Sequence, residues 1–193
     1  MPHIPLSEDL VGIRGLLAFK PSSGAKVAQL IDQLLRGDSE LSAADRERIA
    51  AHVSQLNECE FCARSHAATI PHLDAQIATN ATTAVGSRPM PAPRPAPSLA
   101  QSPSPRLAAL LDLAGEVTRG GHFVTSETVR RARAAGASDE DVHDTVLIAA
   151  AFSMLNRYVD GLGAITPTED AAYDAMGVYL AAHGYLGAAP AVD

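Results

Sequence analysis

The chain has 193 residues, of which 47% are hydrophobic and 19% are charged, a balance that excludes a fully disordered chain. The formal net charge of −7 argues against a nucleic-acid binder, because such a protein needs a basic face to neutralise phosphates. Alanine fills 36 positions and aromatic residues only 4%, which favours helices over strands. We therefore expect an all-α protein with no nucleic-acid partner.

The apolar runs and the cysteine content indicate the compartment. No apolar run approaches the roughly 18 residues that a membrane span requires, and the first residues do not resemble a secretory signal. We expect a cytoplasmic protein with no membrane partner. The two cysteines, Cys59 and Cys62, are three positions apart, and in a reducing compartment such a pair more often indicates redox or metal chemistry than a structural disulfide.

Apolar residues recur with a helical period along most of the chain. Gly37 follows one such segment where a C-terminal cap is expected, and Ser42 with Asp45 approximates a capping box at the start of the next. Pro71 is expected to end the segment that contains the cysteines. The predicted helices cover residues 6–19, 23–36, 42–57, 59–68, 107–119, 126–135, 139–162 and 168–183.

Residues 79–105 differ from the rest of the chain, because seven of its thirteen prolines lie between Pro89 and Pro105. No core can be built from this segment, so we interpret it as an extended linker or surface excursion. It separates an N-terminal helical repeat (residues 1–78) from a C-terminal one (residues 106–193), which together form one compact domain.

The two halves share a sequence pattern. Residues 49–57 (IAAHVSQLN) and 148–156 (IAAAFSMLN) are identical at six of nine positions. The offset of 99 residues is too long for a solenoid repeat, so we interpret the pair as a duplicated helical unit. Only the first copy is followed by thiols, which assigns the redox chemistry to the first half.

Cys59, Cys62 and His66 fall on one face of a helix within two turns. A helix start stabilises a thiolate, and an imidazole one turn later can accept or return a proton. Cysteines three apart in a first turn can also close a disulfide. One thiolate can therefore attack a peroxide or a disulfide while its neighbour resolves the product.

Glu47 lies twelve residues before Cys59, on the preceding predicted helix. If the two helices pack together, its carboxylate points into the site and can act as a base for thiol deprotonation. We expect burial to raise its pKa for that role.

Two other interpretations of the cysteine pair remain open. The thiols can be two buried apolar groups, or part of a zinc site that takes a fourth ligand from Glu47, His52 or His72. We expect no metal and no cofactor.

The pattern Glu-x11-Cys-x2-Cys-x3-His, from Glu47 to His66, resembles the core motif of the carboxymuconolactone decarboxylase and alkylhydroperoxidase (AhpD-like) family. The second half, with Asn156-Arg157 and residues 160–163, resembles the peroxidase-related subgroup of that family. The resemblance implies an AhpD-like all-helical fold with a duplicated unit and assembly into a homo-oligomer: a dimer, trimer or hexamer. It also implies thiol-dependent peroxidase activity without haem or metal.

Carried over by position, the resemblance implies that Cys62 is the peroxidatic thiol, activated by His66 and by Glu47 through a relay. Cys59 is then the resolving thiol. The helix dipole alone favours Cys59 as the thiol of lower pKa. Known members have a His directly before the second cysteine, where this chain has Phe61. This departure bears on the proton relay, and we interpret Phe61 as a packing residue that keeps the site dry.

The resulting hypothesis is a peroxidase that reduces hydrogen peroxide or organic hydroperoxides through a Cys59–Cys62 disulfide. Its partners would be the hydroperoxide and a thiol or dithiol reductant, such as a lipoyl or thioredoxin-like protein. One alternative is an oxidoreductase that acts on protein or lipoyl disulfides. Another is a helical oligomeric protein that binds partners or senses oxidation without catalysis.

Overall fold

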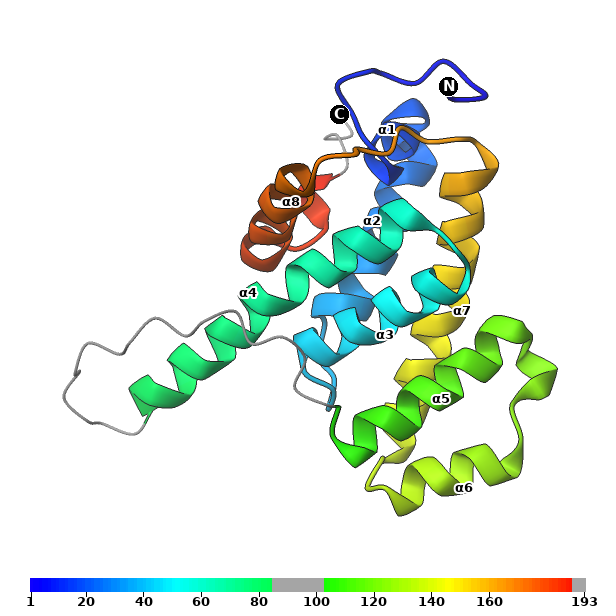
Figure 1. The fold of residues 1–193 in the computed structure, drawn as a ribbon, viewed down its shortest axis with the longest axis vertical. Helices are drawn as coiled ribbons and strands as arrows, with labels where there is room; N and C mark the ends of the chain where they lie inside the picture. Colours follow the sequence, from blue (N-terminus) through cyan, green and yellow to red (C-terminus); the bar gives the residue numbers. More distant parts are fainter. Residues whose placement is uncertain (85–102, 189–193) are drawn as a thin grey trace.

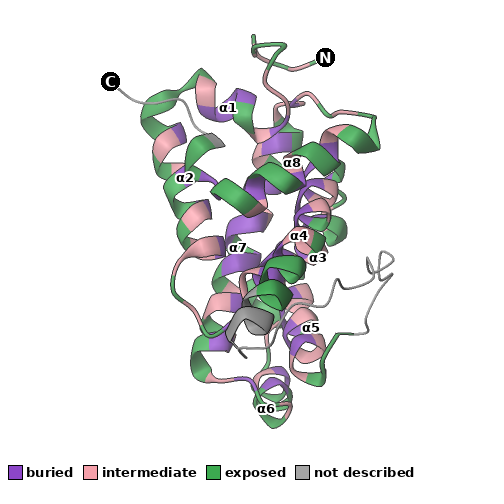
Figure 2. Ribbon diagram, turned by 90° about the vertical axis from the view of Figure 1, so that its left-hand side faces the viewer, coloured by how far each residue is buried: buried purple, intermediate pink, exposed green. Residues whose placement is uncertain are grey.

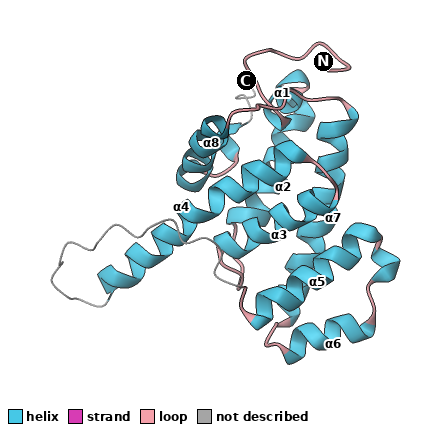
Figure 3. Cartoon of the chain, viewed as in Figure 1, coloured by secondary structure: helices cyan, strands magenta, loops and turns pink. Residues whose placement is uncertain are grey.

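The computed structural model describes residues 1–84 and 103–188, and every regular element in these ranges is a helix (Figures 1 and 3). The all-α prediction is confirmed. None of the helices in this part of the chain is long and apolar enough to cross a membrane. The helices are α1 (Ile13–Phe19), α2 (Pro21–Arg36), α3 (Ala43–Leu56), α4 (Glu60–Ala84), α5 (Pro105–Arg119), α6 (Ser126–Ala134), α7 (Asp139–Gly161) and α8 (Asp170–His183), with 3-10 turns at Gly121–Phe123 and Leu186–Ala188.

Helices α3 and α7 are central to the packing, because they pack against each other and each also packs against α5. Helix α3 packs against α4, α5 and α7, while α8 lies along α4 (Figure 1). Figure 2 shows buried residues along much of α7 and exposed ones on the outer side of α6. The core joins side chains from α3, α5 and α7 that are almost fully buried: Ile49, Val53, Leu110, Leu113, Ile148, Phe152 and Leu155.

The predicted helix starts agree with the caps that are present. The Ser42 hydroxyl accepts a hydrogen bond from the Asp45 N–H at 3.0 Å, and a complete capping box joins Ser138 and Asp141 at the start of α7. The first predicted helix is too long: α1 begins only at Ile13, because Gly12 has a φ of 57°, outside the right-handed helical region.

The helix that contains Cys62 does not end before Pro71 but runs to Ala84. Proline removes one backbone donor from a helix. Contacts with α8 span that point: a Cβ at Gly177 would lie 2.3 Å from the Ala68 carbonyl oxygen, and the Gln76 amide donates to the Ala181 carbonyl. Packing against α8 on both sides of Pro71 therefore keeps α4 continuous. Residues 79–84 of the predicted linker instead form the end of α4, and Pro105 is the first residue of α5, so both predicted boundaries are wrong. Residues 85–102 lie outside the described residues, and the linker there stays a prediction.

The duplicated sequence pattern has a structural counterpart where α3 and α7 meet. The side-chain amide of Asn57 donates from Nδ2 to the side-chain oxygen Oδ1 of Asn156 at 2.9 Å and to the Ser153 hydroxyl at 3.4 Å. In return, the Asn156 amide donates to the Ser54 hydroxyl at 3.0 Å. These residues are the Ser and Asn that the two copies share, so the repeats contact each other through their common positions.

Candidate active site

A tight turn between α3 and α4 positions the two cysteines. The Cys59 N–H donates to the Ser54 carbonyl and the Glu58 N–H to the Gln55 carbonyl, both at 3.0 Å, while Glu58 has a φ of 60°. This is the Schellman pattern of a helix end. Because α4 begins at the next residue, Cys59 immediately precedes it and Cys62 lies in its first turn. His66 follows one turn later.

The two thiols are both free but have different surroundings. Cys59 is fully buried, packed in a cluster with Leu16 and Val159, whereas Cys62 is 5% exposed and lines a cavity. A hydrogen bond with the Cys62 thiol, together with burial, raises the pKa of the Cys59 thiol. The dipole-based expectation that Cys59 has the lowered pKa is therefore wrong.

Glu47 is fully buried and accepts hydrogen bonds from three side chains. Its Oε2 lies 2.6 Å from His66 Nδ1, and its Oε1 accepts from Arg36 Nη2 at 2.6 Å and from the Tyr185 hydroxyl at 2.8 Å. Because an ionised carboxylate only accepts, the shared proton lies on Nδ1, which leaves Nε2 of a neutral His66 as an acceptor. The carboxylate thus fixes the imidazole tautomer and orientation.

The charge state of Glu47 differs from the expectation. Burial would raise its pKa, but the charge of His66 in its protonated form, the hydrogen bond from His66, the charge of Arg36 and the Tyr185 hydrogen bond lower it instead. The prediction of a raised pKa is therefore wrong. Glu47 is also absent from the residues that line the cavity, so it acts on the cavity through His66 and Tyr185, which line it.

Two residues of this network, Arg36 and Tyr185, were missed by the sequence reasoning. Arg36 is in the last turn of α2, and Tyr185 follows Gly184, which ends α8 with a φ of 66°. The Tyr185 N–H donates to Asp32 at 2.7 Å, which ties this end of the chain to α2. Burial and the neighbouring Glu47 raise the pKa of Tyr185, so its hydroxyl stays a donor. No sequence pattern signals a contact between residues 138 positions apart.

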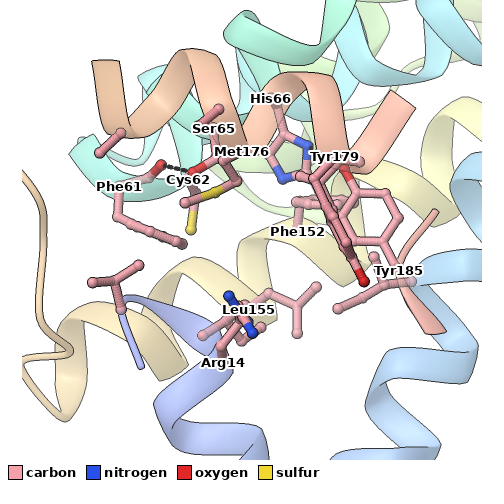
Figure 4. A pocket seen from close by; sticks show the side chains of 16 residues that line it. Arg14, Phe61, Cys62, Ser65, His66, Phe152, Leu155, Met176, Tyr179 and Tyr185 are labelled. Atoms are coloured by element: carbon pink, nitrogen blue, oxygen red, sulfur yellow. Dashed lines mark hydrogen bonds between the residues drawn. The ribbon is translucent and has the colours of Figure 1, made fainter. Parts of the chain in front are cut away.

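A largely apolar cavity of about 340 Å³ opens beside Cys62 and His66 (Figure 4). Side chains from α1, α2, α4, α7 and α8 meet in it. It is lined by Val11, Ile13, Arg14, Ile31, Phe61, Cys62, Ser65, His66, Phe152, Leu155, Ala172, Ala175, Met176, Tyr179, Leu180 and Tyr185. A small molecule that enters this space meets the Cys62 thiol in largely apolar surroundings.

Phe61, at the position where the family that the motif resembles has a histidine, forms part of the cavity wall. Its side chain is 4% exposed and its ring centroid lies 6.2 Å from that of Tyr173. A Cβ at Gly12 would lie 1.9 Å from the Phe61 ring, so only glycine allows this approach. Phe61 cannot carry a proton. Among the described residues that line the cavity, His66 is the one histidine.

The residues considered as zinc ligands all lie in the described part of the chain, and they are not grouped as a metal site. Among residues 1–84 and 103–188, no group of three or more His, Cys, Asp or Glu side chains is arranged to hold a metal ion. His52 instead lines a separate hollow with Asp112, and burial lowers its pKa. His72 does not line the cavity beside Cys62 either.

Comparisons with known proteins agree with this geometry. Residues 21–70, which include Glu47, both cysteines and His66, match the carboxymuconolactone decarboxylase (CMD) family. No curated protein matches the chain.

Two solved structures resemble the fold, and each alignment covers 84% of this chain and 78% of the other with a TM-score of 0.63. One is an uncharacterized peroxidase-related protein from Silicibacter sp. TM1040, which is 23% identical to this chain. The other, described as an alkylhydroperoxidase AhpD core, is an uncharacterized peroxidase-related protein from Ralstonia eutropha JMP134 and is 26% identical. Together, the family match over residues 21–70 and the shared fold support a carboxymuconolactone decarboxylase/AhpD-like, peroxidase-related family for this chain.

Proposed function

We propose that the protein is a thiol peroxidase that reduces hydroperoxides with Cys62 and cycles through a Cys59–Cys62 disulfide. The observation that carries the proposal is the position of the Cys62 thiol in an apolar cavity beside His66, whose Nδ1 is held by the buried Glu47. A carboxylate on one imidazole nitrogen makes the other a better base, which favours a thiolate at Cys62.

In the first step, His66 Nε2 takes the Cys62 proton, and the thiolate attacks the distal oxygen of the hydroperoxide. An S–O bond forms, the O–O bond breaks, and the departing alkoxide takes the proton back as an alcohol. In the second step, Cys59 attacks the sulfenic sulfur: the S–S bond forms, the S–O bond breaks, and hydroxide leaves with the Cys59 proton as water. A thiol or dithiol reductant then restores both thiols.

The difference between the thiols supports this order. Cys62 lines the cavity and is in the first turn of α4, where the helix dipole favours a thiolate. The raised pKa of Cys59 keeps that thiol protonated until the sulfenic acid forms next to it. A resolving thiol needs no earlier activation, because its proton leaves with the water.

The test is peroxide consumption with a dithiol reductant, for the wild type, Cys62→Ser and Cys59→Ser. We expect Cys62→Ser to lose the activity and Cys59→Ser to react once with peroxide and then turn over slowly. Equal rates in the wild type and Cys62→Ser would reject the mechanism. Competition between a hydroperoxide and a protein disulfide separates the peroxidase from a disulfide oxidoreductase.

A further inference from the structure

The cavity beside Cys62 contains one permanently charged side chain, that of Arg14 on α1. No Asp or Glu is among the lining residues. Among the other polar groups, the Ser65 hydroxyl donates to the Phe61 carbonyl, and Tyr185 and His66 are bound to Glu47. The remaining polar side chains of the wall are those of Cys62 and Tyr179. The cation therefore faces an apolar space with no acid of the cavity wall opposite it.

Arg14 differs from the other arginines of residues 1–84 and 103–188, each of which makes an ion pair, a hydrogen bond or a stacking contact. Arg64, for example, bonds to Asp170 at 2.7 Å, and Arg119 lies over the Phe123 ring. In the described part of the chain, Arg14 has no such partner. An exposed guanidinium at the edge of an apolar cavity is a receptor for a carboxylate, which it can bind through two parallel N–H donors.

We infer that the cavity accepts an organic hydroperoxide with an apolar body and one carboxylate, which Arg14 binds. This inference rests on the proposed peroxidase function and specifies its substrate class. Figure 4 shows Arg14 across the cavity from Cys62 and His66. A substrate whose acid end lies at Arg14 therefore presents its opposite end, with the hydroperoxide, to the thiol.

The size of the cavity agrees with a substrate of this class. At about 30 Å³ for each water-sized group, 340 Å³ holds roughly ten non-hydrogen atoms. Hydrogen peroxide would leave most of this apolar space unfilled. A medium-chain carboxylic acid with a terminal hydroperoxide fills it and places its chain against the walls formed by Phe61, Leu155 and Met176.

Binding of an unreactive probe tests the inference without any chemistry. Octanoate and octanol have similar chains, and only octanoate has a carboxylate. We expect the wild type to bind octanoate about fivefold more tightly than octanol, the upper end for a solvent-exposed ion pair, and increasing salt to reduce that preference. Arg14→Gln should lose the preference, whereas the control Arg130→Gln on α6, outside the cavity, should keep it. Equal binding of the two probes by the wild type would overturn the inference.

Kinetics with reduced protein test the same preference in the reaction. The ratio of the rate with terminal hydroperoxy-octanoic acid to the rate with octyl hydroperoxide should fall about fivefold in Arg14→Gln and hold in Arg130→Gln. An unchanged ratio in Arg14→Gln, even with both rates lower, would overturn the inference while the peroxidase function stands. If no hydroperoxide reacts with the wild type, the proposed function fails, and the octanoate measurement alone still decides the binding site.

Discussion

The two copies of the repeat follow the same course up to the matched asparagines, Asn57 and Asn156, and then differ. After Asn57 the chain turns within two residues and α4 begins at Glu60. After Asn156, α7 continues to Gly161 and α8 begins only at Asp170. The second copy uses the same Schellman turn six residues later, with Gly163 at a φ of 58° in the place of Glu58. The early turn in the first copy thus places its two cysteines at a helix start, whereas the matching positions of the second copy, Tyr158 and Gly161, still belong to α7.

The copies also differ in how they use a buried acid. Asp141 in the second copy is paired with Arg106, and it caps α7 by accepting the Ser138 N–H at 2.9 Å. Glu47 in the first copy is paired with Arg36 but also holds His66 and Tyr185. We conclude that Asp141 stabilises the fold, whereas Glu47 stabilises the fold and positions a reactive group.

Glu47→Gln should have the largest effect on this comparison. The variant leaves Arg36 without its buried counterion, so we expect the free energy of unfolding to fall by about 3 kcal/mol. His66 also loses the carboxylate that orients it, so we expect the rate of the peroxide reaction to fall about tenfold or more. The matched variant Asp141→Asn should lower stability in urea unfolding but leave the peroxide rate near that of the wild type. A loss of rate in both variants would mean that the two acids have the same role.

The stability effect of Glu47→Gln should depend on pH. The pKa of Glu47 is lowered in the folded protein, so its contribution is fully present above pH about 4.5, the ordinary value for glutamate, and is lost as the pH falls through the lower folded value. The stability difference between the wild type and the variant should shrink below pH 4.5. A difference that grows on acidification would contradict the ionised state of Glu47.

Tyr185→Phe tests the contact between the end of α8 and the Glu47 network. The variant loses a hydrogen bond to a charged acceptor, so we expect a loss of about 2 kcal/mol of stability and a severalfold slower peroxide reaction. Tyr173→Phe, which loses a bond to the neutral Pro167 carbonyl, should cost about 1 kcal/mol. Equal losses in both variants would show that the Tyr185 hydroxyl does not support the carboxylate.

The two thiols should be alkylated in a defined order. Treatment of the reduced wild type with limiting iodoacetamide at neutral pH should label Cys62 at least tenfold faster than Cys59, because Cys59 is fully buried and its pKa is raised. Peptide mass spectrometry identifies the labelled residue. Preferential labelling of Cys59 would reverse the assigned roles of the thiols.

The smallest effects concern the two Schellman turns. Glu58 has a positive φ that disfavours a side chain, so Glu58→Gly should stabilise the protein by about 0.5 kcal/mol, whereas Gly163→Ala should destabilise it by about 1 kcal/mol. Thermal unfolding of both variants measures the difference. Destabilisation by Glu58→Gly would indicate that the Glu58 side chain makes a contribution larger than its backbone strain.

Local patterns predicted the helices and the motif, because caps, periodicity and the spacing of Glu47, Cys59, Cys62 and His66 act within a few turns. The partners of Glu47 were not predictable in the same way. Arg36 and Tyr185 reach it only after α2, α3 and α8 have packed, and the lowered pKa of Glu47 depends on charges that this packing brings together. The continuation of α4 past Pro71 likewise depends on the contact with α8, which overrides the local effect of proline.

The most direct test of the central claim is to treat the Cys59→Ser variant with one equivalent of hydroperoxide and to measure its intact mass and its peptide map. We predict the rapid addition of one oxygen atom, located at Cys62 and removable by a thiol reductant. An unmodified Cys62 after peroxide treatment would contradict the assignment of this thiol as the reactive group.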